Sequence, residues 1–339
     1  GGLTLFAWRA PLLKQGGLFA PVSREGALVF NNLFLTTACL TVFVGTLYPL
    51  GLEALTGEKI SVGAPFFNLT FAPLFIPLLC AMPFGPLLAW KRGDILGVAQ
   101  RLMTAFGIGL VGIAVTFAAM GTGSALAPFG IGLAFYVMAG ALTDLAERTG
   151  LFRLPLATAA RRAAGMPRST WGTAMAHFGM AVTLLGIVCA STWGEERIVA
   201  LKPTQVVSLS GYDLTFDGMT QRGGPNFREL AAKFTVRSGG AVLGVMEPSK
   251  RSFSSRNTST TEAALMTRGV SQVYLSLGDV NDDGSIAIRV YFKPLVLLIW
   301  LGALVMGLGG ALSLSDRRLR VGAPKPAAKS PKSSLQPAE

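Results

Sequence analysis

The sequence predicts a polytopic α-helical membrane protein of about six full transmembrane helices, with a β-rich domain inserted before the last helix. Hydrophobic residues make up 51% of the chain and charged residues only 14%, whereas about a quarter of the residues in a soluble domain are charged. Apolar runs of roughly 20 residues, the length that crosses about 30 Å of hydrocarbon, recur along the chain. A single long polar segment, residues 193–293, interrupts this pattern.

The apolar runs predict where the membrane helices lie. They cover residues 27–50, 71–90, 102–121, 127–146, 172–192 and 294–314. Residues 1–8 begin without Met and are typical of the end of a further helix, so we expect an N-terminal part of the protein to precede this sequence. The predicted domains are a membrane bundle (1–192), a β-rich domain (193–293), the last transmembrane helix (294–314) and a disordered tail (315–339).

Basic residues predict the orientation in the membrane. If residues 9–26 are cytoplasmic, the segments on that side contain almost all the Lys and Arg of the short loops and the tail, while the short loops opposite hold only Lys59. Basic loops resist translocation. The tail is therefore predicted in the cytoplasm and residues 193–293 on the other side. This distribution attributes the net charge of +12 to topology and not to a nucleic-acid partner.

Residues 193–293 alternate apolar and polar side chains as strands do. Two such runs, 273–277 and 286–292, flank the turn sequence Asn-Asp-Asp-Gly at 281–284, which predicts a β-hairpin. A segment of about 100 residues can bury a modest core. We expect a small β-sandwich or barrel on the membrane surface, with residues 253–261 as an exposed loop.

Few residues can carry chemistry. Cys39, Cys80 and Cys189 each lie inside an apolar run with no metal-ligand spacing, which favours small buried hydrophobic residues. Nucleophile and phosphate-binding motifs are also lacking from the sequence. The chain has a single histidine, His177, so a metal cluster of the usual His/Cys type is excluded.

His177 lies six residues after Trp171, or about 9 Å along a helix, inside the hydrocarbon. An ionisable side chain at this depth is a functional hypothesis by default. Either it forms a hydrogen bond across a helix interface, or it is an axial haem ligand. Ala174 and Ala181, one turn either side, leave room for something flat or for a close helix. A separate stripe of Gly172, Gly179 and Gly186 predicts close approach of another helix.

Several stretches together resemble the CcmF family of cytochrome c-type biogenesis proteins. Among them are residues 23–25 (Ser-Arg-Glu), 45–50 (Gly-Thr-Leu-Tyr-Pro-Leu), 59–63 (Lys-Ile-Ser-Val-Gly), 174–179 (Ala-Met-Ala-His-Phe-Gly), 247–251 (Glu-Pro-Ser-Lys-Arg), 273–278 (Val-Tyr-Leu-Ser-Leu-Gly) and 299–302 (Ile-Trp-Leu-Gly). Each is weak alone, but their order and spacing over nearly the whole chain are specific. The resemblance is to the C-terminal half of the family's members.

The resemblance implies a cytochrome c haem lyase of the bacterial inner membrane, with the β-rich domain in the periplasm. Such enzymes join the haem vinyl groups to the two thiols of a CxxCH motif in apocytochrome c. The implied partners are a haem chaperone of the CcmE type, thiol-handling and delivery subunits of the CcmH and CcmI types, apocytochrome c and membrane lipid, with no nucleic acid.

By similarity, His177 matches one of two intramembrane histidines that ligate a haem b. The resemblance places the second axial ligand and the ligands of the substrate haem upstream, so this half is expected to be inactive alone. Phe227, Phe253, Arg251 and Arg256 are candidates for partner contact on the β-rich domain, with a merely stabilising lid as the alternative. Two other functions stay open: a transporter subunit for haem or another solute, and a non-catalytic scaffold of the maturation complex.

Overall fold

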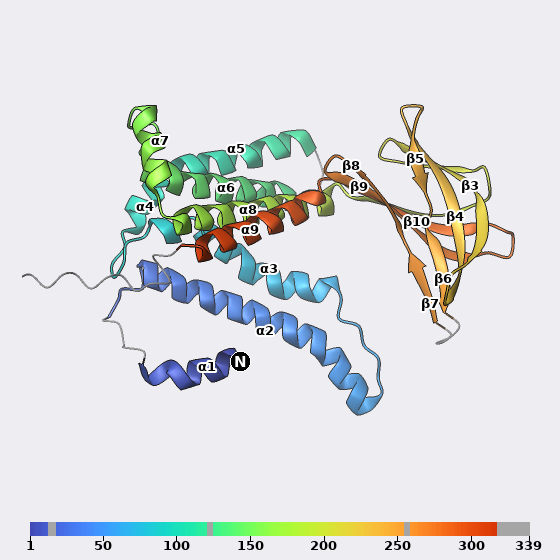
Figure 1. The fold of residues 1–339 in the computed structure, drawn as a ribbon, viewed down its shortest axis with the longest axis horizontal. Helices are drawn as coiled ribbons and strands as arrows, with labels where there is room; N and C mark the ends of the chain where they lie inside the picture. Colours follow the sequence, from blue (N-terminus) through green and yellow to red (C-terminus); the bar gives the residue numbers. More distant parts are fainter. Residues whose placement is uncertain (13–17, 121–124, 254–257, 317–339) are drawn as a thin grey trace, which may run out of the picture.

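The computed structural model describes residues 1–12, 18–120, 125–253 and 258–316. A bundle of helices forms one part of the molecule, and a β-sandwich stands at one end of it (Figure 1). The helices are α1 (Gly2–Arg9), α2 (Arg24–Thr56), α3 (Ala64–Ala81), α4 (Ile95–Arg101), α5 (Met103–Met120), α6 (Ala127–Thr149), α7 (Leu156–Gly165), α8 (Arg168–Thr192) and α9 (Leu297–Leu314), with the short 3-10 turns η1 (Ala10–Leu12) and η2 (Gly85–Leu87).

Six helical segments of the described chain are long and apolar enough to cross a membrane: α2, α3 with its continuation to Leu87, α5, α6, α8 and α9. This confirms the six predicted spans. The most buried is α6, which packs between α5 and α8. In contrast, α2 packs mainly on α3 and is otherwise exposed along most of its length (Figure 1).

The second span differs from its predicted limits of 71–90. The helix α3 begins at Ala64, with Pro65 in its first turn, and ends at Ala81. Pro is favoured in the first turn because it needs no amide partner there, and the polar Thr70 is accommodated by donating its hydroxyl to the carbonyl of Phe66, 2.7 Å away. Pro83 then follows the helix end and cannot continue it. Residues 82–90 therefore form an irregular connection and not the end of a helix.

The helices α8 and α9 cross closely through glycines, as the stripe on α8 predicted. A Cβ atom at Gly179 would lie 2.7 Å from the carbonyl oxygen of Gly302, and one at Gly186 would lie 2.8 Å from the amide nitrogen of Ile299. Contacts this short exclude any side chain at the crossing. At the far end of the pair, Asp316 accepts hydrogen bonds from the backbone and hydroxyl of Ser169, at 3.1 and 2.9 Å.

The tail was predicted from residue 315. The structure describes its first two residues: the Ser315 amide donates to Ala311 and Leu312 of α9, and Asp316 accepts from Ser169 of α8. Residues 317–339 lie outside the described residues.

The β-rich domain contains ten strands in the described chain. They are β1 (Glu195–Leu201), β2 (Val206–Leu209), β3 (Tyr212–Gly223), β4 (Phe227–Ser238), β5 (Ala241–Met246), β6 (Ser249–Phe253), β7 (Thr258–Glu262), β8 (Ala264–Arg268), β9 (Ser271–Val280) and β10 (Ile286–Lys293). One sheet has the order β1-β10-β9-β8 and the other β2-β3-β4-β6-β7, with β5 also paired to β4. Side chains from both sheets, among them Phe216, Phe234 and Ile288, form one buried core. The fold is therefore a sandwich and not a barrel.

The predicted hairpin is confirmed: β9 and β10 pair antiparallel, and Gly284 has the positive φ of 77° that its turn requires. The exposed loop predicted at 253–261 is wrong at both ends. Phe253 closes β6, and Thr258–Glu262 form β7 on the edge of the sheet, while residues 254–257 lie outside the described residues. Serine and threonine suggested a loop, but β-branched Thr is also well suited to an exposed edge strand.

Replacing Gly179 tests the helix crossing. We expect Gly179→Ala to destabilise the protein by about 1–3 kcal/mol, because the new methyl group would overpack the contact with α9. Thermal unfolding in detergent measures the effect. The control is Gly307→Ala on α9, where a Cβ would meet nothing within 4 Å. Equal stability of the two variants would contradict the close crossing.

The β9–β10 turn should be acid-sensitive. The hydroxyl and amide of Ser285 donate hydrogen bonds to Asp283, which also pairs with Lys202, and these contacts lower the pKa of Asp283 from 3.8 to about 2. Because the folded-state pKa is depressed, the stabilisation is complete above the unfolded value and is lost as pH falls from about 4 towards 2.

We expect Asp283→Asn to remove this acid-dependent change from the amide hydrogen exchange of the turn. The control Asp282→Asn leaves the Ser285 contacts in place and should keep the pH dependence of the wild type. If exchange in the turn depends on pH equally in both variants, Asp283 is not the responsible group.

Candidate functional site

A cavity of about 750 Å³ lies at the end of the bundle away from the β-sandwich, between the first turns of α2, the end of α3 and the connection that follows α3. Thr173 and His177 of α8 complete its lining. Ligand sites in proteins are usually clefts of about 300–1,000 Å³. The cavity is therefore large enough for a sizeable organic ligand.

Backbone hydrogen bonds hold the start of α2 against the connection. Ser23 caps α2 by accepting the amide of Gly26 at 3.0 Å. The amide of Arg24 donates to Ala89 at 3.0 Å, and the amide of Gly93 donates to Val22 at 2.7 Å. The two backbone bonds join residues 65 and 71 positions apart in the chain, so the cavity has a defined wall at this end.

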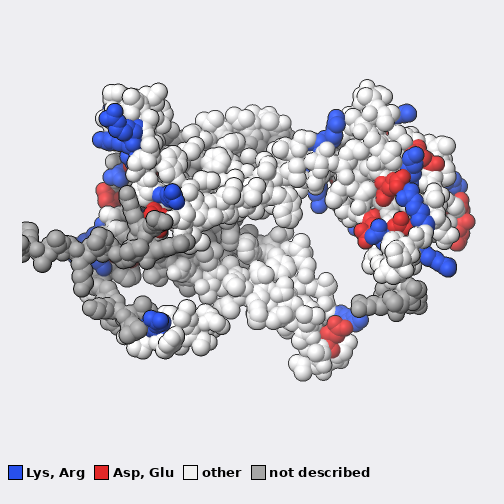
Figure 2. All heavy atoms as spheres, viewed as in Figure 1, with Lys and Arg blue, Asp and Glu red and all other residues white. Residues whose placement is uncertain are grey.

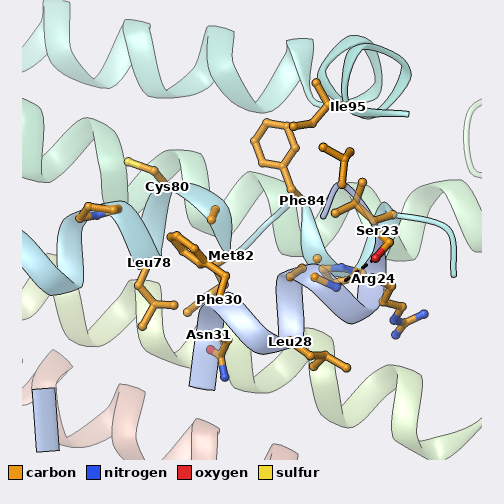
Figure 3. A pocket seen from close by; sticks show the side chains of 18 of the residues that line it. Ser23, Arg24, Leu28, Phe30, Asn31, Leu78, Cys80, Met82, Phe84 and Ile95 are labelled. Atoms are coloured by element: carbon orange, nitrogen blue, oxygen red, sulfur yellow. Dashed lines mark hydrogen bonds between the residues drawn. The ribbon is translucent and has the colours of Figure 1, made fainter. Parts of the chain in front are cut away.

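The walls of the cavity are largely apolar. Figure 3 shows side chains that surround it: Leu28 and Phe30 of α2, Leu78 of α3, and Met82 and Phe84 of the connection after α3. Pro77, Ala81 and Leu88 extend the same surface. A ligand that fits here must have an extensive apolar body, because apolar walls favour apolar surface.

His177 is the titratable group of α8 that lines this cavity. It is half-buried, and no group in the described part of the chain forms a hydrogen bond with its ring. Among the described residues, every side-chain nitrogen or oxygen that is fully buried has a hydrogen-bond partner, so a nitrogen without one is not fully buried. The imidazole nitrogens are therefore accessible from the cavity, and the interhelical hydrogen bond considered from the sequence is absent among these residues. The axial-ligand hypothesis for His177 stays a prediction.

The alanines beside His177 pack against neighbouring helices. Ala174 and Ala181 are both buried, and Ala181 contributes to an apolar cluster with Tyr136 and Val137 of α6. The space beside Ala181 is therefore filled by a neighbouring helix, α6, and not by a flat ligand. The open space beside His177 lies instead towards α2 and α3.

An ion pair near His177, in which the acid is buried and the base is partly exposed, was missed by the sequence analysis. Asp144 of α6 is 4% exposed, accepts from the Nε of Arg148 at 2.8 Å, and interacts electrostatically with His177. Arg148 also donates to the carbonyl of Pro86 in the cavity wall, at 3.3 Å. The sequence did contain an indication of this pair: an acid and a base lie four residues apart at the end of an apolar run, and side chains at this spacing meet on a helix.

The cysteines differ from the prediction that all three are small buried residues. Cys189 is buried, but Cys39 and Cys80 are exposed on the protein surface, and Cys80 lines the cavity. In a membrane helix an apolar face is covered by lipid, so an apolar run does not require burial within the protein. Within the ranges that the structure describes, no three His, Cys, Asp or Glu side chains gather as a metal cluster.

Three of the four candidate contact residues of the β-sandwich lie close together on one sheet. Phe227 and Phe253 lie 5.9 Å apart, and the Arg251 guanidinium lies 4.6 Å from the Phe227 ring centroid. Arg251 also donates to Glu229 at 2.9 Å, a contact that lowers the pKa of that carboxyl. Because Arg251 is already engaged by Glu229 and Phe227, these contacts favour a role in stabilising the sandwich over a role in partner contact. Arg256 lies outside the described residues.

Comparisons with known proteins agree with this arrangement. The family "CcmF C-terminal beta-sandwich" matches residues 192–294. Cytochrome c-type biogenesis protein CycK of Bradyrhizobium diazoefficiens is 63% identical over the whole chain and over 51% of its own length. CcmF of Escherichia coli K12 is 33% identical over 94% of this chain and 48% of its own length. The chain is therefore similar to CcmF-family proteins along nearly its whole length.

A solved structure, "Cytochrome c Heme Lyase CcmF", superimposes with a TM-score of 0.67 at 25% sequence identity, covering 88% of this chain and 46% of that one. The resemblance found in the sequence is therefore confirmed, as are the membrane bundle and the β-rich domain. The chain spans about half the length of the curated relatives that it matches. It corresponds to their C-terminal half.

Removing the Asp144 carboxylate tests the Asp144–Arg148 pair. We expect Asp144→Asn to lower the free energy of unfolding by about 1–3 kcal/mol, because Arg148 loses a charge-assisted hydrogen bond inside the bundle. Thermal unfolding in detergent is the measurement. Asp94→Asn is the control, since Asp94 is exposed and forms no ion pair with a described residue. A melting temperature unchanged in Asp144→Asn would show that the pair does not stabilise the bundle.

Proposed function

We propose that this chain forms the C-terminal half of a cytochrome c haem lyase, which attaches haem covalently to the CxxCH cysteines of apocytochrome c, and that it holds a haem b with His177 as one axial ligand. The observation that carries the proposal is the accessible imidazole of the chain's single histidine in a large apolar cavity of the bundle. The similarity to cytochrome c-type biogenesis proteins and to the solved structure of a CcmF supports it.

The residues of the cavity fit a haem in three respects. A neutral imidazole nitrogen is an ordinary haem ligand, and that of His177 is not engaged by another described residue. The walls suit the apolar macrocycle, and the volume lies in the range of ligand sites. Haem bound there would supply one-electron redox chemistry. His177 would hold it in place, and the surrounding helices would keep water away and so tune its potential.

The second axial ligand and the ligands of the substrate haem would come from the part of the family's sequence that this chain does not cover. The matched relatives are about twice as long as this chain. We therefore expect lyase activity only when the two halves are together.

The charge distribution supports the proposed orientation. Lys and Arg gather around α7 and the neighbouring loops, at the end of the bundle away from the β-sandwich, while the middle of the bundle is nearly uncharged (Figure 2). Arg153, Arg161 and Arg162 belong to this basic end. Basic loops stay cytoplasmic, so the β-sandwich would lie in the periplasm and the end of α9 at the cytoplasmic face of the bacterial inner membrane.

This placement makes the sandwich accessible to periplasmic partners. The proposed ones are a haem chaperone of the CcmE type, subunits of the CcmH and CcmI types, and apocytochrome c itself. Because the sandwich is connected directly to α8 and α9, a partner bound to it would stand over the bundle that holds His177.

The proposal is tested by an absorption spectrum of the protein purified with its N-terminal half. We expect a reduced b-type band in the wild type and its loss in His177→Ala, because the iron loses an axial ligand. Phe178→Ala is the control: Phe178 is the next residue of α8 but does not line the cavity. The yield of covalent cytochrome c in cells should fall in parallel with the band.

If the wild-type complex contains no haem, the proposal is wrong, and the transporter and scaffold alternatives are favoured instead. A band of full intensity in His177→Ala would show that haem is bound elsewhere. Solute flux in proteoliposomes without cytochrome c maturation would identify a transporter.

A further inference from the structure

Arg24 is the charged side chain in the lining of the cavity, among the residues that the structure describes. Arg24 is the first residue of α2, and α2 and α8 begin at the same end of the bundle (Figure 1). His177 lies nine residues after the start of α8. The histidine therefore lies about 13 Å along α8 from the start of that helix. A ligand between the two residues would meet a metal-binding nitrogen at depth and a cation near the rim.

The guanidinium of Arg24 is positioned by an aromatic ring. It lies 5.1 Å from the ring centroid of Trp90, within the distance of a cation–π contact. The backbone amide of Arg24 donates to Ala89, next to that tryptophan. Stacking of this kind holds the planar group while leaving its N–H donors at the edge available for an anion.

No carboxylate in the described ranges forms an ion pair with Arg24. The neighbouring acid, Glu25, is engaged instead by Lys91, through the backbone amide at 2.8 Å and the ammonium at 3.5 Å. A guanidinium in an apolar wall without an acidic partner favours a ligand that brings its own carboxylate or phosphate.

We infer that Arg24 binds a propionate carboxylate of the haem whose iron is held by His177. This inference rests on the proposed function, and it adds a residue that orients the ligand. Haem has an apolar body, an iron atom and two carboxylates at one edge. Apolar walls, His177 and Arg24 provide a partner for each of these in one cavity. An anionic lipid headgroup offers similar chemistry at the rim, and the experiment distinguishes the two.

The test compares haem with its dimethyl ester, which lacks the carboxylate charges. Haem is removed from the purified complex of both halves, and each ligand is titrated back while the Soret absorbance is measured. The wild type should bind haem about 10- to 100-fold more tightly than the ester, as expected for charge-assisted hydrogen bonds. Arg24→Gln should lose this preference by weakening haem binding alone, and Arg24→Lys should retain part of it.

Arg92→Gln is the matched control, because Arg92 is exposed in the same connection but does not line the cavity. It should keep the wild-type preference. Equal affinity of the wild type for haem and ester overturns the inference without any substitution. So does an unchanged preference in Arg24→Gln, and a loss of co-purified anionic lipid in that variant would then assign Arg24 to a headgroup.

These outcomes are separable from failure of the proposed function. If haem binds and depends on His177 but Arg24 has no influence on the ester preference, the role of Arg24 alone is wrong. If the wild-type complex binds neither ligand, both proposals fall.

Discussion

The close crossing of α8 and α9 determines much of the rest of the molecule. Glycines at the contact bring the two backbones together, so that Gly179 meets Gly302 without intervening side chains. The same pair leads directly into the sandwich, because α8 is followed by β1 and α9 is preceded by β10, and these strands pair along their whole length from Glu195 opposite Phe292. The β-sandwich is therefore an extension of the helix pair and is held above the bundle by it.

The second constraint is that the polar imidazole of His177 needs a partner within the hydrocarbon. An unsatisfied polar group there costs several kcal/mol. The opposite face of α8 from the glycines packs against α6, where Ala181 is fully buried, and His177 faces the space beside α2 and α3. A nitrogen that is open to a cavity and has no hydrogen bond from the described residues requires either water or a ligand. The apolar walls favour the ligand.

Hydrophobic length and periodicity were sufficient to predict the six spans, the hairpin of β9 and β10 and the glycine-mediated crossing, because each depends on residues close together in the chain. The cavity could not be predicted, since it forms where residues near 25, 80 and 177 meet. The boundary of α3 was misplaced because polar residues such as Thr70 satisfy themselves within a helix. From the sequence, Arg24 was used as a basic residue of a cytoplasmic segment and as part of the Ser-Arg-Glu stretch at 23–25. A role in ligand binding follows from its place in the cavity wall.

The central claim is that His177 ligates iron in this cavity, and chemical rescue tests it most directly. In His177→Gly, purified with the N-terminal half, the side chain is replaced by a space that free imidazole can enter. We predict that the low-spin b-type spectrum is lost in this variant and returns on addition of imidazole, with no such change in the wild type. A low-spin spectrum that persists in the variant without imidazole would contradict the assignment.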